Sequence, residues 1–275
     1  MKLNHQIHNL TLYKDINDFL EAYSLRLIDE LGERIIGIYL TGSLSYGDFN
    51  INRSDIDITN IISRKLVDDE IQLIKEFHTN LENDFPKWSQ RMECTYTPIK
   101  MLANTMPPAE PRPWYYGNEK KLYEEAPYGN EWIINKYLLY KHAIPLMGTD
   151  FKNLTNKVDI KEVQKACIRD VTSEWKPKLN DDEYFKDSHR ASYFVLNLCR
   201  ILYTLLNKQT RTKKESSNWI KNEFNEWKYI IELVQNWEYG KEMNKQKLIR
   251  DFANFVFNKI EETDLYNDLQ KLKKL

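Results

Sequence analysis

The sequence has few of the residues that mark several common functional classes. Its three cysteines, Cys94, Cys167 and Cys199, match neither a zinc-binding nor a disulfide spacing, and its five histidines are scattered. Both observations argue against a transition-metal site. No run of about eighteen apolar residues is present to span a membrane, and the first residues, MKLNHQIHNL, lack the apolar core of a signal peptide. We therefore expect a cytoplasmic protein with free thiols.

The chain also lacks a strong net charge of either sign. Its 40 Lys and Arg residues nearly balance 41 Asp and Glu residues, which leaves a formal charge of −1. No global basic field therefore favours nucleic acid as the main partner. With 275 residues, 41% of them hydrophobic and 29% charged, the chain fits a globular protein of one large or two ordinary domains.

One stretch, residues 35–62 (IIGIYLTGSLSYGDFNINRSDIDITNII), carries the strongest chemical signal. Its apolar, β-branched start predicts a buried strand, which Gly42 and Ser43 follow. Asp55 and Asp57 open a second apolar run, and they should share one face because strand side chains alternate. Two such carboxylates suit Mg²⁺, which also keeps waters and binds substrate phosphates. Small residues at the Gly-Ser turn let backbone N–H groups approach phosphate oxygens.

This combination resembles the nucleotidyltransferase signature, in which Gly-Ser is followed by Asp-x-Asp. The alternative is a hairpin whose aspartates face water, but two aspartates in a strand are disfavoured unless something uses them. The resemblance implies ATP as co-substrate and one or two Mg²⁺ ions held by Asp55 and Asp57. Gly42, Ser43 and Ser54 would then contact the phosphates.

An α+β domain is predicted over residues 1–153. Helical spacing over residues 15–32 and 67–84 predicts two helices that flank a sheet, and the alternating run 91–99 predicts a third strand. Glu93 lies in that strand, where it could add a third carboxylate to the aspartate pair.

Two further segments differ from the predicted strands and helices. Within the first domain, residues 100–128 are rich in proline and are expected to form a long loop without regular structure. From residue 154 onward only helical periods occur, and these predict an α-helical bundle over residues 154–275. The expected helices of that bundle are 159–175, 188–207, 215–236 and 244–271.

Within the nucleotidyltransferases, the chain looks most like the bacterial aminoglycoside adenylyltransferases that act on streptomycin and spectinomycin, over residues 30–240. In that family a glutamate on the strand after the aspartate pair is the general base, which implies this role and contact with the acceptor for Glu93. The alternative is a glutamate that faces solvent. A family tryptophan that lines the drug pocket matches Trp132, although Trp132 could equally anchor its helix in the core.

The family resemblance extends to cations of the helical domain. In the family, an arginine and a lysine of the C-terminal domain contact the nucleotide. Arg200 and Lys213 have the same spacing in this chain, which implies the same role for them. Trp219 matches a tryptophan further along the chain. The alternatives are a surface arginine with a local partner for Arg200 and a solvated charge run for Lys213.

The drug-binding part of the resemblance shows one departure. The family places acidic residues just before the arginine-bearing helix, whereas this chain has His189 and Arg190 there. Asp187 would substitute if the loop shifts, and Trp175 resembles a tryptophan near the same pocket.

The resemblance implies Mg²⁺-dependent transfer of AMP from ATP to a hydroxyl group of streptomycin or spectinomycin, with release of pyrophosphate and antibiotic resistance. We expect a monomer without nucleic-acid or membrane partners. Three alternatives stay open. One is the same chemistry on a lincosamide, another small alcohol or a protein hydroxyl. The second is a nucleic-acid end-modifying transferase, which the near-zero charge disfavours. The third is a non-catalytic antitoxin or regulatory module, which the retained carboxylates and cations disfavour.

Overall fold

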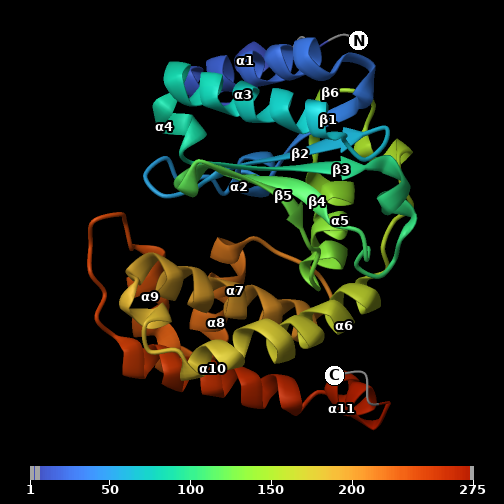
Figure 1. Ribbon diagram of the computed structural model, residues 1–275. Coiled ribbons are helices and arrows are strands. Elements are labelled where there is room, and N and C mark those ends of the chain that lie inside the picture. Colours follow the sequence, from blue (N-terminus) through green and yellow to red (C-terminus); the bar gives the residue numbers. More distant parts are fainter. Residues whose placement is uncertain (1–2, 4–6, 273–275) are drawn as a thin grey trace. The chain divides into compact units, whose positions relative to one another are not determined.

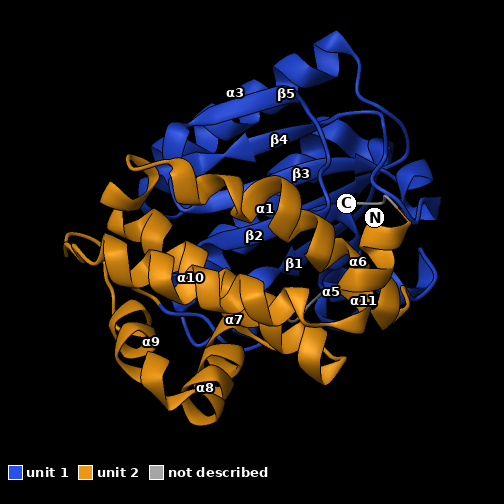
Figure 2. Ribbon diagram, turned by 90° about the horizontal axis from the view of Figure 1, so that it is seen from below, with its two compact units in different colours: residues 1–50, 54–157 blue, residues 51–53, 158–275 orange. Residues whose placement is uncertain are grey.

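The computed structural model describes residue 3 and residues 7–272. The chain divides into two compact units, coloured separately in Figure 2. The boundary predicted between residues 153 and 154 falls within the last segment of unit 1, and no sequence pattern predicts that three residues before Ser54 belong to unit 2. The units are residues 1–50 and 54–157 for unit 1, and residues 51–53 and 158–275 for unit 2.

Unit 1 is built on a six-stranded mixed sheet with the order β5-β4-β3-β2-β1-β6. β2 and β3 run parallel, and every other pair of neighbours is antiparallel. The parallel pair needs a crossover connection, which the helices between them supply. The strands are β1 (Ile35–Thr41), β2 (Ile56–Ile62), β3 (Met92–Pro98), β4 (Arg112–Tyr116), β5 (Lys121–Ala126) and β6 (Ile144–Met147).

Helices cover one face of this sheet with apolar side chains. α1 and α3 lie together on that face (Figure 1), and the phenol oxygen of Tyr23 in α1 accepts a hydrogen bond from Asn60 Nδ2 of β2 at 2.8 Å. α1 ends where predicted, because Gly32 takes a φ of +49° that favours glycine. The helices of unit 1 are α1 (Lys14–Leu31), α2 (Gly42–Ser45), α3 (Asp68–Asp84), α4 (Pro86–Ser89) and α5 (Glu131–His142).

The expectation of a loop without regular structure over residues 100–128 is wrong. β4 and β5 form there, and β4 pairs with β3 and β5 on its two sides. Pro113 is tolerated because the pairing of β4 with β5 shifts register between Arg112 and Trp114, where a regular ladder bond is interrupted. β6 was also not expected, and it pairs with the outer side of β1.

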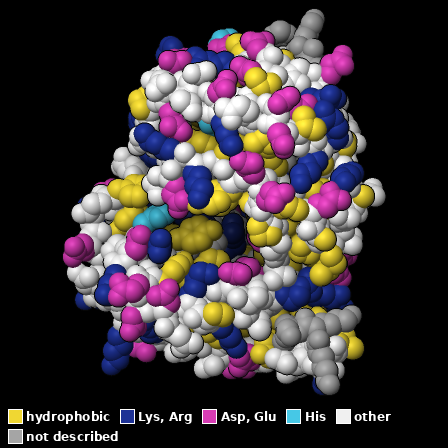
Figure 3. Space-filling view, viewed as in Figure 1, with side chains coloured by type: hydrophobic (Ala, Val, Ile, Leu, Met, Phe, Trp, Pro, Cys, Tyr) yellow, Lys and Arg dark blue, Asp and Glu magenta, His cyan; other side chains and the backbone are white. Residues whose placement is uncertain are grey.

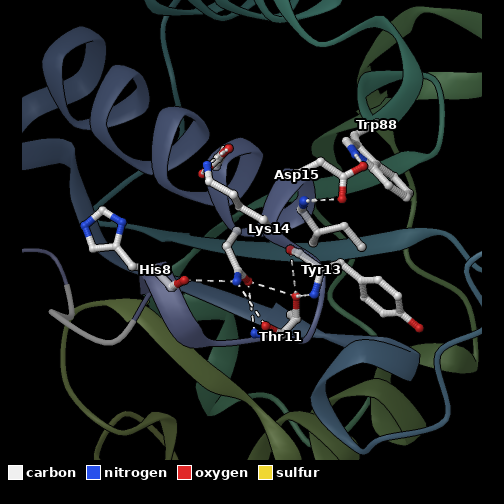
Figure 4. Close-up of polar contacts among 9 residues, drawn as sticks. His8, Thr11, Tyr13, Lys14, Asp15 and Trp88 are labelled. Carbon is white, nitrogen blue, oxygen red and sulfur yellow. Dashed lines mark hydrogen bonds and ion pairs between the residues drawn. The ribbon is translucent and has the colours of Figure 1, made fainter.

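Polar contacts fasten the segment before α1 to the rest of unit 1 (Figure 4). The side chain of Asn17 is 3% exposed and donates to the carbonyl oxygens of His8 and Thr11, at 3.1 and 3.0 Å. Asp15, at the start of the helix, accepts from the indole N–H of Trp88 at 3.0 Å. The Asn17 bonds hold the preceding segment against α1, and the Asp15–Trp88 bond connects α1 to α4, which lies directly before β3.

Unit 2 is helical, and its centre is α7. Twelve of the residues in this helix are apolar or aromatic, and the structure buries Asn197 and Thr204 as well. The predicted helices 215–236 and 244–271 are each divided in two, the second because Thr263 caps a new helix. The helices are α6 (Ile160–Asp170), α7 (Ser188–Asn207), α8 (Lys213–Glu223), α9 (Lys228–Gln235), α10 (Gln246–Glu261) and α11 (Asp264–Lys271).

Arg53 holds the short excursion of residues 51–53 within unit 2. Its guanidinium donates to the carbonyl oxygen of Val234, in α9, at 3.0 Å. The chain therefore leaves unit 1 after α2 and returns to it directly before Asp55.

The surface carries both signs of charge. Lys and Arg side chains alternate with Asp and Glu side chains over the face drawn in Figure 3, in agreement with the near-zero net charge. Among the helices of the described residues, none combines the length and the apolar character that crossing a membrane requires.

Candidate active site

The sheet register brings Asp57 and Glu93 together. β2 and β3 are parallel, and Asp57 pairs directly with Glu93. Residues paired in this way point to the same face of a sheet. Both side chains are half-buried, whereas the neighbouring Ile56 and Cys94 point to the helix-covered face and are at most 1% exposed. Two carboxylates therefore share the face that α1 and α3 leave uncovered.

Gly42 lies directly against the carboxylate of Asp57. A Cβ atom added to Gly42 would lie 1.7 Å from Asp57 Oδ2 and 2.6 Å from Asp57 Cγ. The φ of Gly42 is +63°, a conformation that L side chains rarely adopt. Steric space and backbone conformation thus both require glycine where α2 begins.

Arg91 fixes the backbone on both sides of Asp55. Its guanidinium donates to the carbonyl oxygen of Ser54, and its own carbonyl oxygen accepts from the N–H of Ile56 at 2.7 Å. The Arg91 guanidinium lies 5.1 Å from the ring centroid of Trp88, the residue that binds Asp15. Asp55 therefore has its main chain held by the residue that precedes β3.

The phenol of Tyr116 lies close enough to Asp55 and Glu93 for both carboxylates to raise its pKa. Tyr116 pairs with Glu93 across β3 and β4. Burial is the largest cause that raises the pKa of Tyr116, and the negative charges of Glu93 and Asp55 raise it further. The structure thus gathers Gly42, Asp55, Asp57 and Glu93 at one end of β2 and β3.

The two predicted serines lie in the segments that lead to these carboxylates. Ser43 is the second residue of α2, and its carbonyl oxygen accepts from the N–H of Asp48 at 2.9 Å. The hydroxyl of Ser54 accepts from the N–H of Asn50 at 2.9 Å and closes the turn before Asp55. These bonds shape the loop, and phosphate contacts by Ser43 and Ser54 stay predictions.

Unit 2 gathers its two predicted cations on one face of α7. Tyr193, Asn197 and Arg200 are spaced by four and three residues, which places them in line along the helix. Arg200 Nη2 donates to Asn197 Oδ1 at 2.9 Å. Lys213, the first residue of α8, places its Nζ 4.2 Å from the ring centroid of Tyr193. Helical spacing and a cation–π contact thus hold both cations near Tyr193.

Trp175 and Asp187 have structural contacts in unit 2. The Trp175 indole is 8% exposed, donates to Asp170 Oδ2 at 2.6 Å and lies 6.0 Å from the Tyr193 ring. Asp187 caps α7, because its carboxylate accepts from the N–H groups of His189 and Arg190 at 2.8 and 3.2 Å. Their contacts with an acceptor stay predictions.

Trp132 lies in α5 of unit 1 and is 5% exposed. Its ring centroid is 4.6 Å from that of Tyr128, whose hydroxyl is 2.8 Å from the hydroxyl of Thr97. Thr97 lies on β3, two pleats along the strand from Glu93 and on the same face. Contact of Trp132 with an acceptor also stays a prediction.

Two groups of residues on these faces are not predicted from the sequence. One is the pair Tyr193 and Asn197, which the spacing to Arg200 could have revealed. The other comprises Trp114 and Tyr116 of β4, which lie in the segment for which the sequence predicts a loop. The alternation of the run around Pro113 was the available signal, and the prolines nearby obscured it.

The carboxylates fit a magnesium ion that arrives with a nucleotide. Two aspartate carboxylates supply hard oxygen ligands, and Gly42 leaves room for one of them against the backbone. Within the described part of the chain, no group of three or more His, Cys, Asp or Glu side chains could enclose a metal ion alone. Phosphate oxygens and waters would therefore have to complete the coordination.

Comparison with known proteins gives two matches. Residues 153–259 match the family model described as the C-terminal domain of aminoglycoside adenylyltransferase. The fold is similar to that of a spectinomycin adenyltransferase, AAD(9) from Enterococcus faecialis, crystallised with ATP and spectinomycin. That match has a TM-score of 0.69 and 16% identity and covers 89% of this chain and 99% of the other. A search of curated proteins finds no match. The α+β fold with a mixed sheet followed by helices is thus confirmed.

Proposed function

We propose that this chain, which belongs through its C-terminal domain to the aminoglycoside adenylyltransferase family of nucleotidyltransferase enzymes, transfers AMP from ATP to a hydroxyl group of an aminoglycoside-type antibiotic. Pyrophosphate leaves, and the modified drug loses its action, which gives resistance. The spectinomycin adenyltransferase of similar fold was crystallised with ATP and spectinomycin, so spectinomycin and streptomycin are the first acceptors to consider. The observation that carries the proposal is the direct pairing of Asp57 with Glu93 beside Gly42.

Glu93 would act as the general base. Its carboxylate takes the proton from the acceptor hydroxyl as the oxygen forms a bond to the α-phosphorus of ATP. The bond from that phosphorus to the bridging oxygen breaks, and pyrophosphate departs. Half-burial on a strand fixes the position of the carboxylate, which favours attack from one direction.

Asp55 and Asp57 would hold one or two Mg²⁺ ions. When bound, magnesium neutralises the triphosphate and stabilises the charge that develops during transfer. Gly42 and Ser43 would contact phosphate oxygens through backbone N–H groups, and Ser54 would orient the same loop. Arg200 and Lys213 would contribute positive charge toward the nucleotide, and Trp132, Trp175 and Asp187 would contact the acceptor.

Pyrophosphate release tests this function. ATP and Mg²⁺ are incubated with streptomycin, spectinomycin, kanamycin or lincomycin, and the wild type is compared with Glu93→Gln. We expect turnover of streptomycin or spectinomycin and a loss of roughly a thousandfold in the variant. Glu76→Gln is the matched control, because Glu76 is an exposed glutamate of α3.

Other results would contradict parts of this proposal. Equal turnover by Glu93→Gln would remove Glu93 from its role as base. ATP binding without turnover of any of the four acceptors would reject the antibiotic and would direct the search to other small alcohols or protein hydroxyls. If ATP with Mg²⁺ fails to raise the melting temperature, the nucleotidyltransferase activity itself is rejected.

A further inference from the structure

Three aromatic side chains form a row on the face of the sheet that carries the carboxylates. We call Trp114, Tyr116 and Tyr123 the aromatic row. The ring centroid of Trp114 lies 5.4 Å from that of Tyr116 and 5.3 Å from that of Tyr123, with interplanar angles of 19° and 24°. All three side chains are half-buried. Nearly parallel rings thus line β4 and β5.

The register places one end of this row beside the expected base. Tyr116 pairs with Glu93, and Trp114 pairs with Thr95, the next residue of β3 on the same face. Tyr115, between them, points to the opposite face, where it is 1% exposed and donates to Glu82 at 2.7 Å. Packing under the helices therefore accounts for Tyr115, whereas Trp114 and Tyr116 belong to the carboxylate face.

Charge around the row favours a cation. The carboxylates of Glu93 and Asp55 act on Tyr116, and the hydroxyl of Tyr123 donates to the carboxylate of Glu119. At the outer end, Lys121 Nζ already lies 4.3 Å from the ring centroid of Tyr123. Aromatic faces attract cations through their quadrupole, and the adjacent carboxylates strengthen this preference.

We propose that Trp114 and Tyr116 form the acceptor subsite, and that they hold a cationic aminocyclitol or amino-sugar ring beside Glu93. The apolar C–H face of the ring packs on the aromatic side chains, while its ammonium groups face the carboxylates. Tyr123, covered by Lys121, supports Trp114 from behind. This subsite rests on the proposed function. It identifies the aromatic and acidic side chains that would select a cationic aminocyclitol or amino sugar as the acceptor.

Steady-state kinetics of Trp114→Leu and Tyr116→Phe test the subsite, with spectinomycin and streptomycin as acceptors. We expect the acceptor KM to rise about tenfold or more in Trp114→Leu and severalfold in Tyr116→Phe, while the KM for ATP stays unchanged. Tyr115→Phe is the matched control, because it alters the same strand on the opposite face. Trp114→Phe keeps a ring in place if the leucine variant does not fold, and we expect it to raise the acceptor KM less.

The possible results separate this subsite from the function it rests on. Turnover by the wild type with unchanged acceptor KM in every Trp114 and Tyr116 variant would overturn the subsite and leave the function standing. An ATP KM that rises as much as the acceptor KM would also overturn it, since the row would then serve the nucleotide or general folding. Binding of ATP without binding or turnover of either antibiotic would overturn both, because the row would lack the occupant assigned to it.

Discussion

The two units position their predicted site residues in different ways. In unit 1 the carboxylates are fixed by backbone pairing, with Asp57 opposite Glu93 and Gly42 against the Asp57 side chain. In unit 2 the cations are held by side-chain contacts, Arg200 by Asn197 and Lys213 by the ring of Tyr193. Backbone pairing leaves little freedom, whereas a long cationic side chain can adjust. We therefore infer that changes in unit 1 reduce the rate of the chemical step and that changes in unit 2 mainly reduce nucleotide affinity.

The comparison predicts its largest effect for Gly42→Ala. The added methyl group would collide with Asp57 Oδ2, so the carboxylate must move, and we expect kcat to fall roughly a thousandfold. Gly47→Ala is the control, because Gly47 also has a positive φ, of +77°, but nothing lies within 4 Å of the added atom. It carries the backbone strain without the collision. Equal losses in the two variants would show that strain alone matters.

Arg91→Lys should have the next largest effect. Lysine keeps the positive charge but loses the planar guanidinium that donates to Ser54 and lies near Trp88. The main chain beside Asp55 then loses the hydrogen bond at Ser54 and keeps the one at Ile56. We expect kcat to fall roughly 30-fold with little change in melting temperature. The control is Arg26→Lys, since Arg26 pairs with Asp84 at the surface and lies 5.9 Å from the Phe85 ring. A kcat equal to wild type in Arg91→Lys would remove Arg91 from the positioning of Asp55.

A smaller effect is expected in unit 2. Tyr193→Leu removes the ring under Lys213 but leaves the lysine in place, so the KM for ATP should rise about fivefold while kcat stays near wild type. Tyr229→Leu provides the control, because Tyr229 is 58% exposed in the same unit and has Lys245 Nζ 6.0 Å from its ring centroid. A fall in kcat larger than the rise in KM would break the distinction between the units.

Local signals predicted the three strands that carry or lead to the carboxylates. The β-branched strands, the glycine at the turn and the alternation of Asp55 and Asp57 depend on neighbours in sequence, so residues 35–62 and Glu93 could be placed from the chain alone. The partnership of Tyr116 with Glu93 could not, because it requires β4 to pair with β3. Pro113 obscured that strand, and only the pairing explains how the proline is accommodated at a register shift.

The same limit applied in unit 2. The spacing of Arg200 along α7 was visible in the sequence, but the contact of Lys213 with Tyr193 depends on how α8 packs on α7. The excursion of residues 51–53 into unit 2 likewise depends on Arg53 reaching Val234. A short polar loop has no hydrophobic periodicity, so the sequence around Arg53 does not predict a contact with Val234, which is distant in sequence.

Acid should reveal a further difference between the units, through His78 on the helix-covered face of unit 1. Burial lowers the pKa of His78 from 6.5 to about 3, so between these values the unfolded chain binds a proton that the folded chain does not. The free energy of unfolding should therefore fall as the pH is lowered below 6.5, by about 2 kcal/mol at pH 5 from this residue. Urea titrations at pH 7.5, 6 and 5 measure it.

His78→Phe isolates that contribution from those of the carboxylates. The variant loses the contact with the Tyr96 hydroxyl at 2.9 Å and is expected to be less stable at pH 7.5, but it has no imidazole to protonate. Its stability should consequently depend less steeply on pH than that of the wild type. Parallel pH profiles for wild type and His78→Phe would mean that the folded protein admits a proton at His78.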